Sequence, residues 1–161
     1  GGKRPYGYKG LGEISVFIFF GLVATLGTYY TESGKLTLWA LALAIEMGFL
    51  SCAILAVNNL RDLPKDALVG KHTLAVRLGD KRARNFLITL IVLPLLIQCA
   101  FIYITNLALL SLLVIPSVVK IIRTIRRGAV NAELIPALGA VAKLQSSLTL
   151  WIVIALVLGK P

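Results

Sequence analysis

Two aspartates and an asparagine recur at four-residue intervals in a polar stretch between two long apolar runs. Asn58, Asp62 and Asp66 lie within residues 58–79, NNLRDLPKDALVGKHTLAVRLG. Four residues on a helix turn a side chain by only about 40°, so a helix here would direct these oxygens to one side. Mg²⁺ takes a few carboxylates and completes its shell with water or phosphate oxygens. The spacing predicts a magnesium site with Asp62 and Asp66 as ligands and Asn58 or Asn59 as a neutral oxygen donor.

Basic side chains are interleaved with these acidic ones. Arginine binds phosphate through forked hydrogen bonds and lysine binds it as a point charge. The candidates for a bound diphosphate are Arg61, Lys65, Lys71 and Arg77. The combination predicts a magnesium diphosphate site in which Asp62 and Asp66 carry the catalysis. From spacing alone, a solvated loop of mixed charge is an equally good interpretation. His72, the single histidine, is interpreted as a surface or headgroup contact rather than a catalytic base.

The apolar runs around this stretch indicate a membrane protein. Of the 161 residues, 58% are hydrophobic, and the mean hydropathy is +0.87. Apolar runs of about 18 residues or more with few charges are typical of transmembrane helices. We expect an all-α, polytopic bundle forming a single domain over residues 1–161. The expected spans are about 14–30, 36–57, 85–104, 107–122 and 134–158.

The formal net charge of +10 does not indicate a nucleic-acid partner, because the basic residues lie in loops between apolar runs. Such loops orient a membrane protein and meet anionic headgroups of the lipid bilayer. If the start of the chain is cytoplasmic, the expected spans put fifteen of the seventeen Lys and Arg residues inside, leaving only Lys35 and Lys160 outside. The stretch 58–84 is therefore expected to face the cytoplasm.

Pro64 is expected to end the second helix near Asp62, because the residue before a proline avoids the α region. A short helix is expected to restart with Pro64 at its first position, where the missing N–H costs nothing. Asp66 would lie in the first turn of that helix. The two carboxylates would then remain neighbours without sharing a continuous helical face.

Four of the polar or sulfur-containing residues inside the apolar runs carry specific expectations: Glu46, Cys52, Gln98 and Cys99. Glu46 has two interpretations that stay open, a group lining a pocket or the partner of another helix, because a carboxylate within a span is costly when unpartnered. Gln98 is expected to form an interhelical hydrogen bond. Cys52 and Cys99 are expected to be buried, unpaired thiols that behave as small hydrophobic groups.

Three stretches closely resemble the UbiA-type intramembrane prenyltransferases, in the order and spacing of that family. They are RPYGYKGLGE at 4–13, NNLRDLPKD at 58–66 and GKHTLAVRLGD at 70–80. The resemblance is strongest to the branch of menaquinone synthesis. It implies Mg²⁺-dependent transfer of a polyprenyl group from polyprenyl diphosphate to 1,4-dihydroxy-2-naphthoate, with decarboxylation to demethylmenaquinone. It also implies a bacterial cell (inner) membrane location and a bundle of nine helices around a central cavity.

Asn58, Asp62 and Asp66 match the second acidic motif of the family. The first, an Asn-Asp motif, is absent from these residues, so we expect the C-terminal part of a longer enzyme, inactive alone. By the same resemblance, the acceptor side is lined by residues of the first stretch. These are Tyr6, Tyr8 and Lys9, although their spacing departs from the family's YxxxK pattern.

Two other functions are alternatives to the one that this resemblance implies. CDP-alcohol phosphotransferases also place spaced aspartates at a membrane surface, but their Asp-Gly and Ala-Arg dipeptides do not occur before Asp62. A non-catalytic scaffold or transporter with a basic, headgroup-binding loop is the alternative from a different class. Binding of a prenyl diphosphate that depends on magnesium separates the enzyme from the scaffold.

Overall fold

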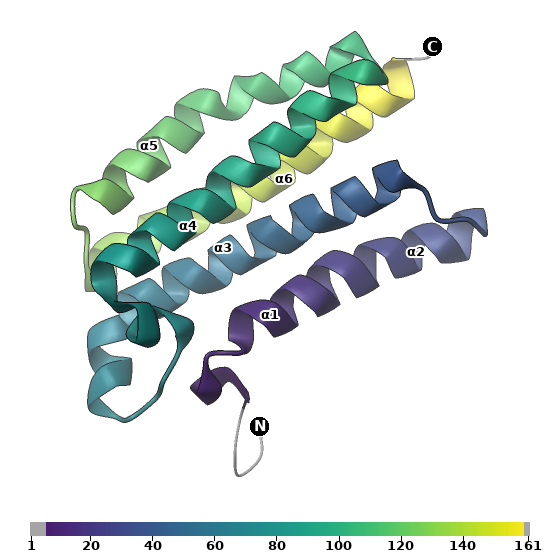
Figure 1. Ribbon diagram of the computed structural model, residues 1–161. Helices are drawn as coiled ribbons and strands as arrows, with labels where there is room; N and C mark the ends of the chain where they lie inside the picture. The colour runs from purple at the N-terminus through teal and green to yellow at the C-terminus, as the bar shows by residue number, and fades with distance from the viewer. Residues whose placement is uncertain (1–5, 160–161) are drawn as a thin grey trace.

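Five long helical spans run up and down through residues 6–159, the part of the chain that the computed structural model describes (Figure 1). A 3-10 turn, η1 (Tyr6–Lys9), precedes the first span, which joins α1 (Gly12–Val16), a π-helical segment η2 (Phe17–Val23) and α2 (Ala24–Ser33). The second and third spans are α3 (Leu38–Leu68) and α4 (Leu74–Ala100), and α4 is followed by the 3-10 turn η3 (Phe101–Tyr103). The last two spans are η4 (Asn106–Val114) with α5 (Ile115–Arg126), and η5 (Asn131–Leu134) with α6 (Ile135–Leu158).

Each of these five spans is long and apolar enough to cross a bilayer. The 31 residues of α3 extend about 46 Å, against a hydrocarbon thickness of about 30 Å. The apolar run of α3 ends at Val57, so its last turns project polar residues beyond the hydrocarbon. The predicted all-α transmembrane bundle is confirmed, and each expected range falls on one of the observed spans.

Helix α3 continues through Pro64 to Leu68, so the predicted helix end near Asp62 and the restart at Pro64 are wrong. A proline removes one hydrogen-bond donor and crowds the preceding turn. Beyond it the helical pattern persists, and the Val69 N–H donates to the Lys65 carbonyl at 3.2 Å. As a consequence, Asp62 and Asp66 keep a four-residue spacing on one uninterrupted helix.

Helix α4 begins at Leu74, eleven residues before the predicted start at residue 85. The Thr73 hydroxyl caps its first turn by accepting a hydrogen bond from the Val76 N–H at 3.4 Å. Gly79, with φ 73° and ψ 164°, interrupts the helix, and only glycine adopts such a conformation readily. The residues around this break are mostly charged, so the first turns of α4 do not form part of an apolar run in the sequence.

The connections between spans divide into two groups at opposite ends of the bundle (Figure 1). The η1 turn, the α3–α4 loop and the α5–α6 loop lie at one end. The α2–α3 connection, the α4–η4 connection and the end of α6 lie at the other. The end of the bundle with the first group, helix ends included, holds all of the Lys and Arg residues among 6–159 except Lys35, as expected from the sequence. The cytoplasmic orientation of this basic end stays a prediction.

Helix α3 is central to the packing, because it contacts the first span, α4 and α6. Gly21 and Gly48 face each other where α3 crosses the first span, and a Cβ on Gly21 would overlap the Gly48 backbone. Small residues at such crossings let transmembrane helices approach closely. On its other sides α3 buries Leu50 and Val57 in the main apolar core. This close packing fixes the position from which the polar end of α3 projects.

Two buried polar side chains link α3 to α4. The Gln98 amide nitrogen donates to Glu46 Oε1 at 2.8 Å, and both side chains are fully buried. The predicted interhelical bond of Gln98 is confirmed, and Glu46 is thereby the partner of another helix. Within residues 6–159, Glu46 Oε2 and Gln98 Oε1 have no partner. One hydrogen bond therefore joins the pair across the α3–α4 interface, and one oxygen on each side chain has no partner within residues 6–159.

The two cysteines have different surroundings. Cys52 is buried as predicted, and its thiol donates to the Glu13 carbonyl at 3.0 Å. Cys99 is exposed, so the prediction of a buried thiol is wrong. It lies on a side of α4 that no described residue covers, and an apolar neighbourhood in the sequence does not reveal which side of a helix is covered.

We expect Gln98→Leu to lower the free energy of unfolding by about 1–3 kcal/mol, because it leaves the buried Glu46 carboxyl without its donor. Thermal unfolding of the purified protein in mild detergent measures the change. The double variant Glu46→Leu/Gln98→Leu removes both polar groups and should recover most of the loss. A single variant as stable as the original, or a double variant that is much less stable than the single one, contradicts this account.

Candidate functional site

The polar end of α3 lies beside the starts of α1 and α4 at the basic end of the bundle (Figure 1). The α3–α4 loop folds back toward the helix that precedes it, because the Lys71 N–H donates to the Asp66 carbonyl at 2.9 Å. The loop is short, from Val69 to Thr73. The described residues of the three stretches that carry the family resemblance lie at this one end of the bundle (Figure 1).

Asp62 forms a forked ion pair with its neighbour in the sequence. Arg61 Nε and Nη2 each donate to one Asp62 oxygen at 2.8 Å. These hydrogen bonds hold the pKa of Asp62 below its ordinary value, against the opposing effect of partial burial. The Asp62 side chain is still 39% exposed. It is thus an ionised carboxylate at the surface, in the turns of α3 that lie beyond the apolar run.

Asp66 is paired with the loop that follows α3. Lys71 Nζ donates to both Asp66 oxygens, at 3.0 and 3.2 Å. The Asp66 side chain is only 8% exposed and that of Lys71 is 26% exposed. Lys71 Nζ also lies 5.7 Å from the centroid of the Tyr8 ring, within the range of a cation–π interaction. The structure therefore brings together three predicted site residues from η1, α3 and the loop.

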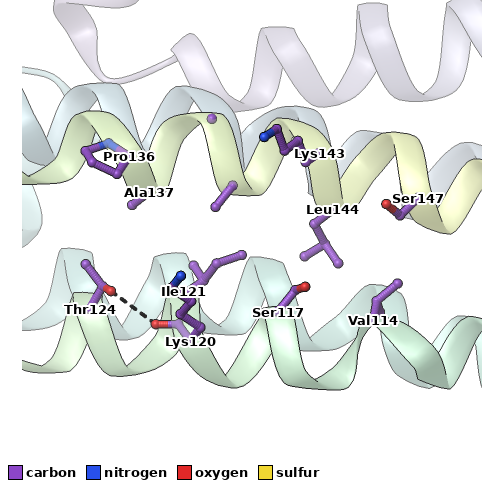
Figure 2. A pocket seen from close by; sticks show the side chains of 12 residues that line it. Val114, Ser117, Lys120, Ile121, Thr124, Pro136, Ala137, Lys143, Leu144 and Ser147 are labelled. Atoms are coloured by element: carbon purple, nitrogen blue, oxygen red, sulfur yellow. Dashed lines mark hydrogen bonds between the residues drawn. The ribbon is translucent and has the colours of Figure 1, made fainter.

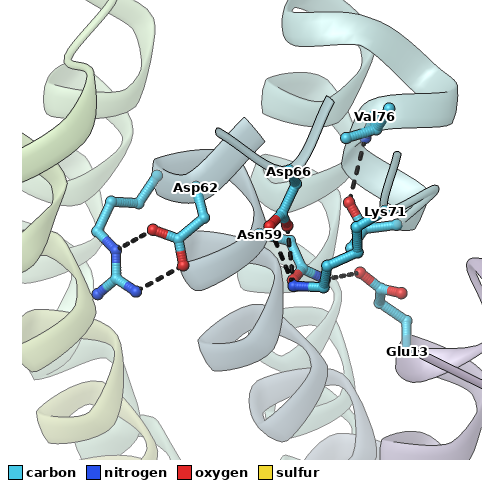
Figure 3. A network of polar contacts seen from close by, with 8 residues as sticks. Glu13, Asn59, Asp62, Asp66, Lys71 and Val76 are labelled. Atoms are coloured by element: carbon cyan, nitrogen blue, oxygen red, sulfur yellow. Dashed lines mark hydrogen bonds and ion pairs between the residues drawn. The ribbon is translucent and has the colours of Figure 1, made fainter. Parts of the chain in front are cut away.

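A further carboxylate, that of Glu13, lies beside the Asp66–Lys71 ion pair, and the sequence did not single it out. The Asn59 amide nitrogen donates to Glu13 Oε1 at 2.8 Å. Glu13 is 5% exposed, and within residues 6–159 its Oε2 has no partner. Figure 3 shows Asn59, Asp66 and Lys71 side by side, whereas the Asp62 carboxylate turns away from them. In this arrangement each aspartate serves a separate ion pair.

Asn59 rather than Asn58 belongs to this cluster for a geometric reason. Residues 59 and 66 are seven positions apart, which differs from two full helical turns by only about 20°. Asn58 is half-buried and makes no side-chain hydrogen bond within residues 6–159. The sequence does contain a feature that indicates Glu13 as a site residue, since it is the one carboxylate in the glycine-rich first stretch.

The remaining predicted site residues lie at the margin of this cluster. Lys9 and Lys65 are exposed and form no ion pair with a described residue. Arg77 is exposed, and its Nε donates to the His72 carbonyl at 3.2 Å. The Tyr6 side chain lies outside the described part of the structure. The geometry thus connects Tyr8, Asp66 and Lys71. Among the other predicted basic residues, only Arg61 is paired with one of the two aspartates.

The donor set fits a metal ion that is shared with a substrate rather than one enclosed by protein. Among residues 6–159, no three His, Cys, Asp or Glu side chains are grouped closely enough to hold a metal ion. Asp62 and Asp66 offer two carboxylates, and Mg²⁺ in phosphate complexes takes one or two from the protein. Arg61 and Lys71 accompany them as cations suited to phosphate oxygens. The set is complementary to both parts of a magnesium diphosphate.

Comparisons with known proteins agree with the sequence resemblance. The chain is 43% identical over 138 residues to a 1,4-dihydroxy-2-naphthoate octaprenyltransferase of Mycobacterium tuberculosis, covering 86% of this chain and 47% of that protein. It is 46% identical over 100 residues to the Haemophilus influenzae protein of the same name, covering 62% of this chain and 32% of that one. It is 32% identical over 131 residues to human UbiA prenyltransferase domain-containing protein 1, covering 81% of this chain and 39% of that one. No solved structure gives a significant match.

The chain spans less than half of the length of each of these relatives. The model of the UbiA prenyltransferase family matches residues 4–133, a range that includes all three resembling stretches and the whole cluster of Glu13, Asn59, Asp66 and Lys71. With most of its length matched in this way, the chain belongs to the UbiA prenyltransferase family.

Proposed function

We propose that this chain supplies the diphosphate-binding half of a polyprenyltransferase active site. The observation that carries the proposal is the pair of carboxylates four residues apart on α3, each with its own cation: Asp62 with Arg61 and Asp66 with Lys71. A polyprenyl diphosphate with Mg²⁺ presents both a cation and phosphate oxygens to such a set. The relatives' names, which specify octaprenyl transfer, support the same class of donor.

Asp62 and Asp66 are the residues that would hold Mg²⁺. When bound, the ion would offset negative charge on the diphosphate. Asp66 is already positioned by Lys71, whereas Asp62 is more exposed and paired only with its sequence neighbour. Asp62 can therefore reorient toward the phosphates with little change elsewhere in α3.

The cations and the apolar helices supply the rest of the chemistry. As the bond between the allylic carbon and the diphosphate breaks, Arg61 and Lys71 would bind the departing oxygens and offset their growing charge. Lys65 and Arg77, which are exposed at the margin of the cluster, would serve the outer phosphate oxygens. The apolar spans would keep water away from the allylic carbocation until the aromatic ring attacks it.

The acceptor and the cellular setting are parts of the same proposal. The relatives' names support 1,4-dihydroxy-2-naphthoate as the acceptor. Prenylation of its ring with loss of carbon dioxide would give demethylmenaquinone. Tyr8 and Lys9, with Tyr6, would line the acceptor side. The chain would form the C-terminal part of the complete enzyme, and the other acidic motif of the family would lie in the remaining part. The site would face the cytoplasm in a bacterial cell membrane, because the basic end of the bundle carries it.

Asp62→Asn and Asp66→Asn, made in the complete protein, should each lower the rate of prenyl transfer on the order of a hundredfold or more, because each removes charge that positions the metal diphosphate. Transfer of a radiolabelled polyprenyl group in isolated membranes measures the rate. Glu133→Gln is the matched control, since Glu133 is an exposed acid at the same end of the bundle. Near-normal transfer by either aspartate variant would refute the assignment.

The same variants separate an enzyme from a membrane scaffold. Binding of a non-hydrolysable prenyl thiodiphosphate should require Mg²⁺ and should weaken in both aspartate variants. A scaffold that binds phosphate through its basic loop alone should bind the compound equally well after the metal is chelated. That result would favour the scaffold whatever the rate of transfer in membranes.

Glu13→Ala should lower the free energy of unfolding by about 1–3 kcal/mol, because the buried Asn59 amide loses its acceptor. Glu13→Gln keeps a carbonyl oxygen in the same place and should lose much less. Thermal unfolding in detergent measures both changes. If the two variants lose equal stability, the negative charge of Glu13 rather than its hydrogen bond to Asn59 stabilises this end of the bundle.

A further inference from the structure

A groove separate from the aspartate site runs between α5 and α6. Its volume is about 550 Å³. Its inner wall is apolar, with Ile121, Ala137 and Leu144 all buried. Figure 2 shows Lys120 extending from α5 into the space between the two helices, with Ser117 on the same helix. Lys143 and Ser147 belong to the facing helix α6. The groove thus combines an apolar wall with cationic and hydroxyl groups.

The charge of this groove is entirely positive. Lys120 and Lys143 line it, and no acidic residue does. All of the ion pairs found among residues 6–159 involve other side chains, so neither lysine has an acidic partner there. The nearest acid on the α5–α6 connection is Glu133, whose side chain instead accepts from the Val130 N–H at 3.2 Å. Two ammonium groups therefore share one groove without a counter-charge.

The lysines lie a few helical turns inside the basic end of the bundle. Lys120 precedes the last residue of α5, Arg126, by six positions, and Lys143 follows the first residue of α6, Ile135, by eight. At 1.5 Å for each residue, Lys120 lies roughly 9 Å from the end of α5 and Lys143 roughly 12 Å from the start of α6. From there, a lysine stem can follow the apolar wall while its ammonium group reaches the phosphate level.

The groove is held open by the packing of α5 against α4. Arg84 is buried and donates from Nη1 to the Ile125 carbonyl at 2.9 Å, while Asp80 accepts from its Nε and Nη2. This arginine fixes the end of α5 at the Ile125 carbonyl, which also accepts a hydrogen bond from the Gly128 N–H at 3.3 Å. On the α6 side, Gly139 leaves space, because a Cβ there would meet no atom within 4 Å. The groove is thus part of the fold rather than a gap between loose segments.

We propose that this groove binds the headgroup of an anionic phospholipid, with its phosphate between Lys120 and Lys143 and an acyl chain along the apolar wall. Charge complementarity selects this occupant. An apolar helix seated in the groove would leave two ammonium groups without a partner next to hydrocarbon, which is costly. Anionic lipids are abundant at the basic face of a membrane protein and are attracted by lysines near the surface. This inference is independent of the proposed prenyl transfer.

The test is lipid binding by the complete protein in detergent, measured by native mass spectrometry with dioleoylphosphatidylglycerol and, for comparison, dioleoylphosphatidylcholine. Lys120→Gln/Lys143→Gln should weaken phosphatidylglycerol binding by about thirtyfold, because two lysines at the surface each contribute to the attraction. Arg126→Gln/Arg127→Gln is the matched control. It removes two exposed charges from the same end but none from the groove, and it should change binding less than about threefold.

A second variant tests the groove without altering charge. Gly139→Leu fills open space in the groove and should block phosphatidylglycerol while favouring the helix itself. Equal weakening by the lysine and arginine pairs would overturn the proposal, because it would reveal only general surface charge. Displacement of the lipid by millimolar inorganic phosphate would also overturn it, as would an unchanged affinity in Gly139→Leu. A lysine variant whose unfolding temperature falls equally with and without phosphatidylglycerol would indicate that another part of the protein fills the groove.

Discussion

A polar side chain next to hydrocarbon is stable only when another group meets its charge or its hydrogen bonds. Helix α3 depends on this requirement along much of its length. Glu46 accepts a hydrogen bond from Gln98 of α4, and Asn59 donates one to Glu13 of α1. Asp66 forms an ion pair with Lys71 of the α3–α4 loop. Each partner comes from a different element, so the same pairs that make the polar residues of α3 tolerable also fix its neighbours against it.

The two aspartates at the end of α3 differ in how they meet this requirement. Asp66 is buried and takes its cation from across a loop, so its ion pair also determines where the loop lies. Asp62 is more exposed and takes its cation from the adjacent residue, so its pair constrains nothing else. A ligand can therefore exchange partners with Asp62 at small structural cost, whereas exchange at Asp66 must release Lys71 from the loop geometry. Asp66 is therefore suited to fixing the geometry of the site, and Asp62 is suited to binding an incoming ligand.

The sequence was sufficient for features that depend on composition over many residues. Apolar runs gave the five spans, and Gln98 was recognisable as an interhelical donor because an amide inside a span needs a partner. Features that depend on a single residue's direction were not accessible. The choice of Asn59 over Asn58 is a rotation of about 100° on one helix, and the exposure of Cys99 depends on which side of α4 is covered. Pro64 failed as a helix terminator because its local preference was outweighed by the helical hydrogen bonds beyond it.

Positive charge at the basic end of the bundle is of two kinds, which counting charges does not distinguish. Within residues 6–159, all the ion pairs lie between positions 61 and 84, where Arg61, Lys71 and Arg84 are each held by an aspartate. The cations of α5 and α6 have no such partners. A paired cation has a fixed direction and can recognise a ligand of defined shape, whereas an unpaired one attracts any anion within reach unless a cavity limits it. The aspartates fix the orientation of the cations at the end of α3. The groove between α5 and α6 limits which anions can reach Lys120 and Lys143.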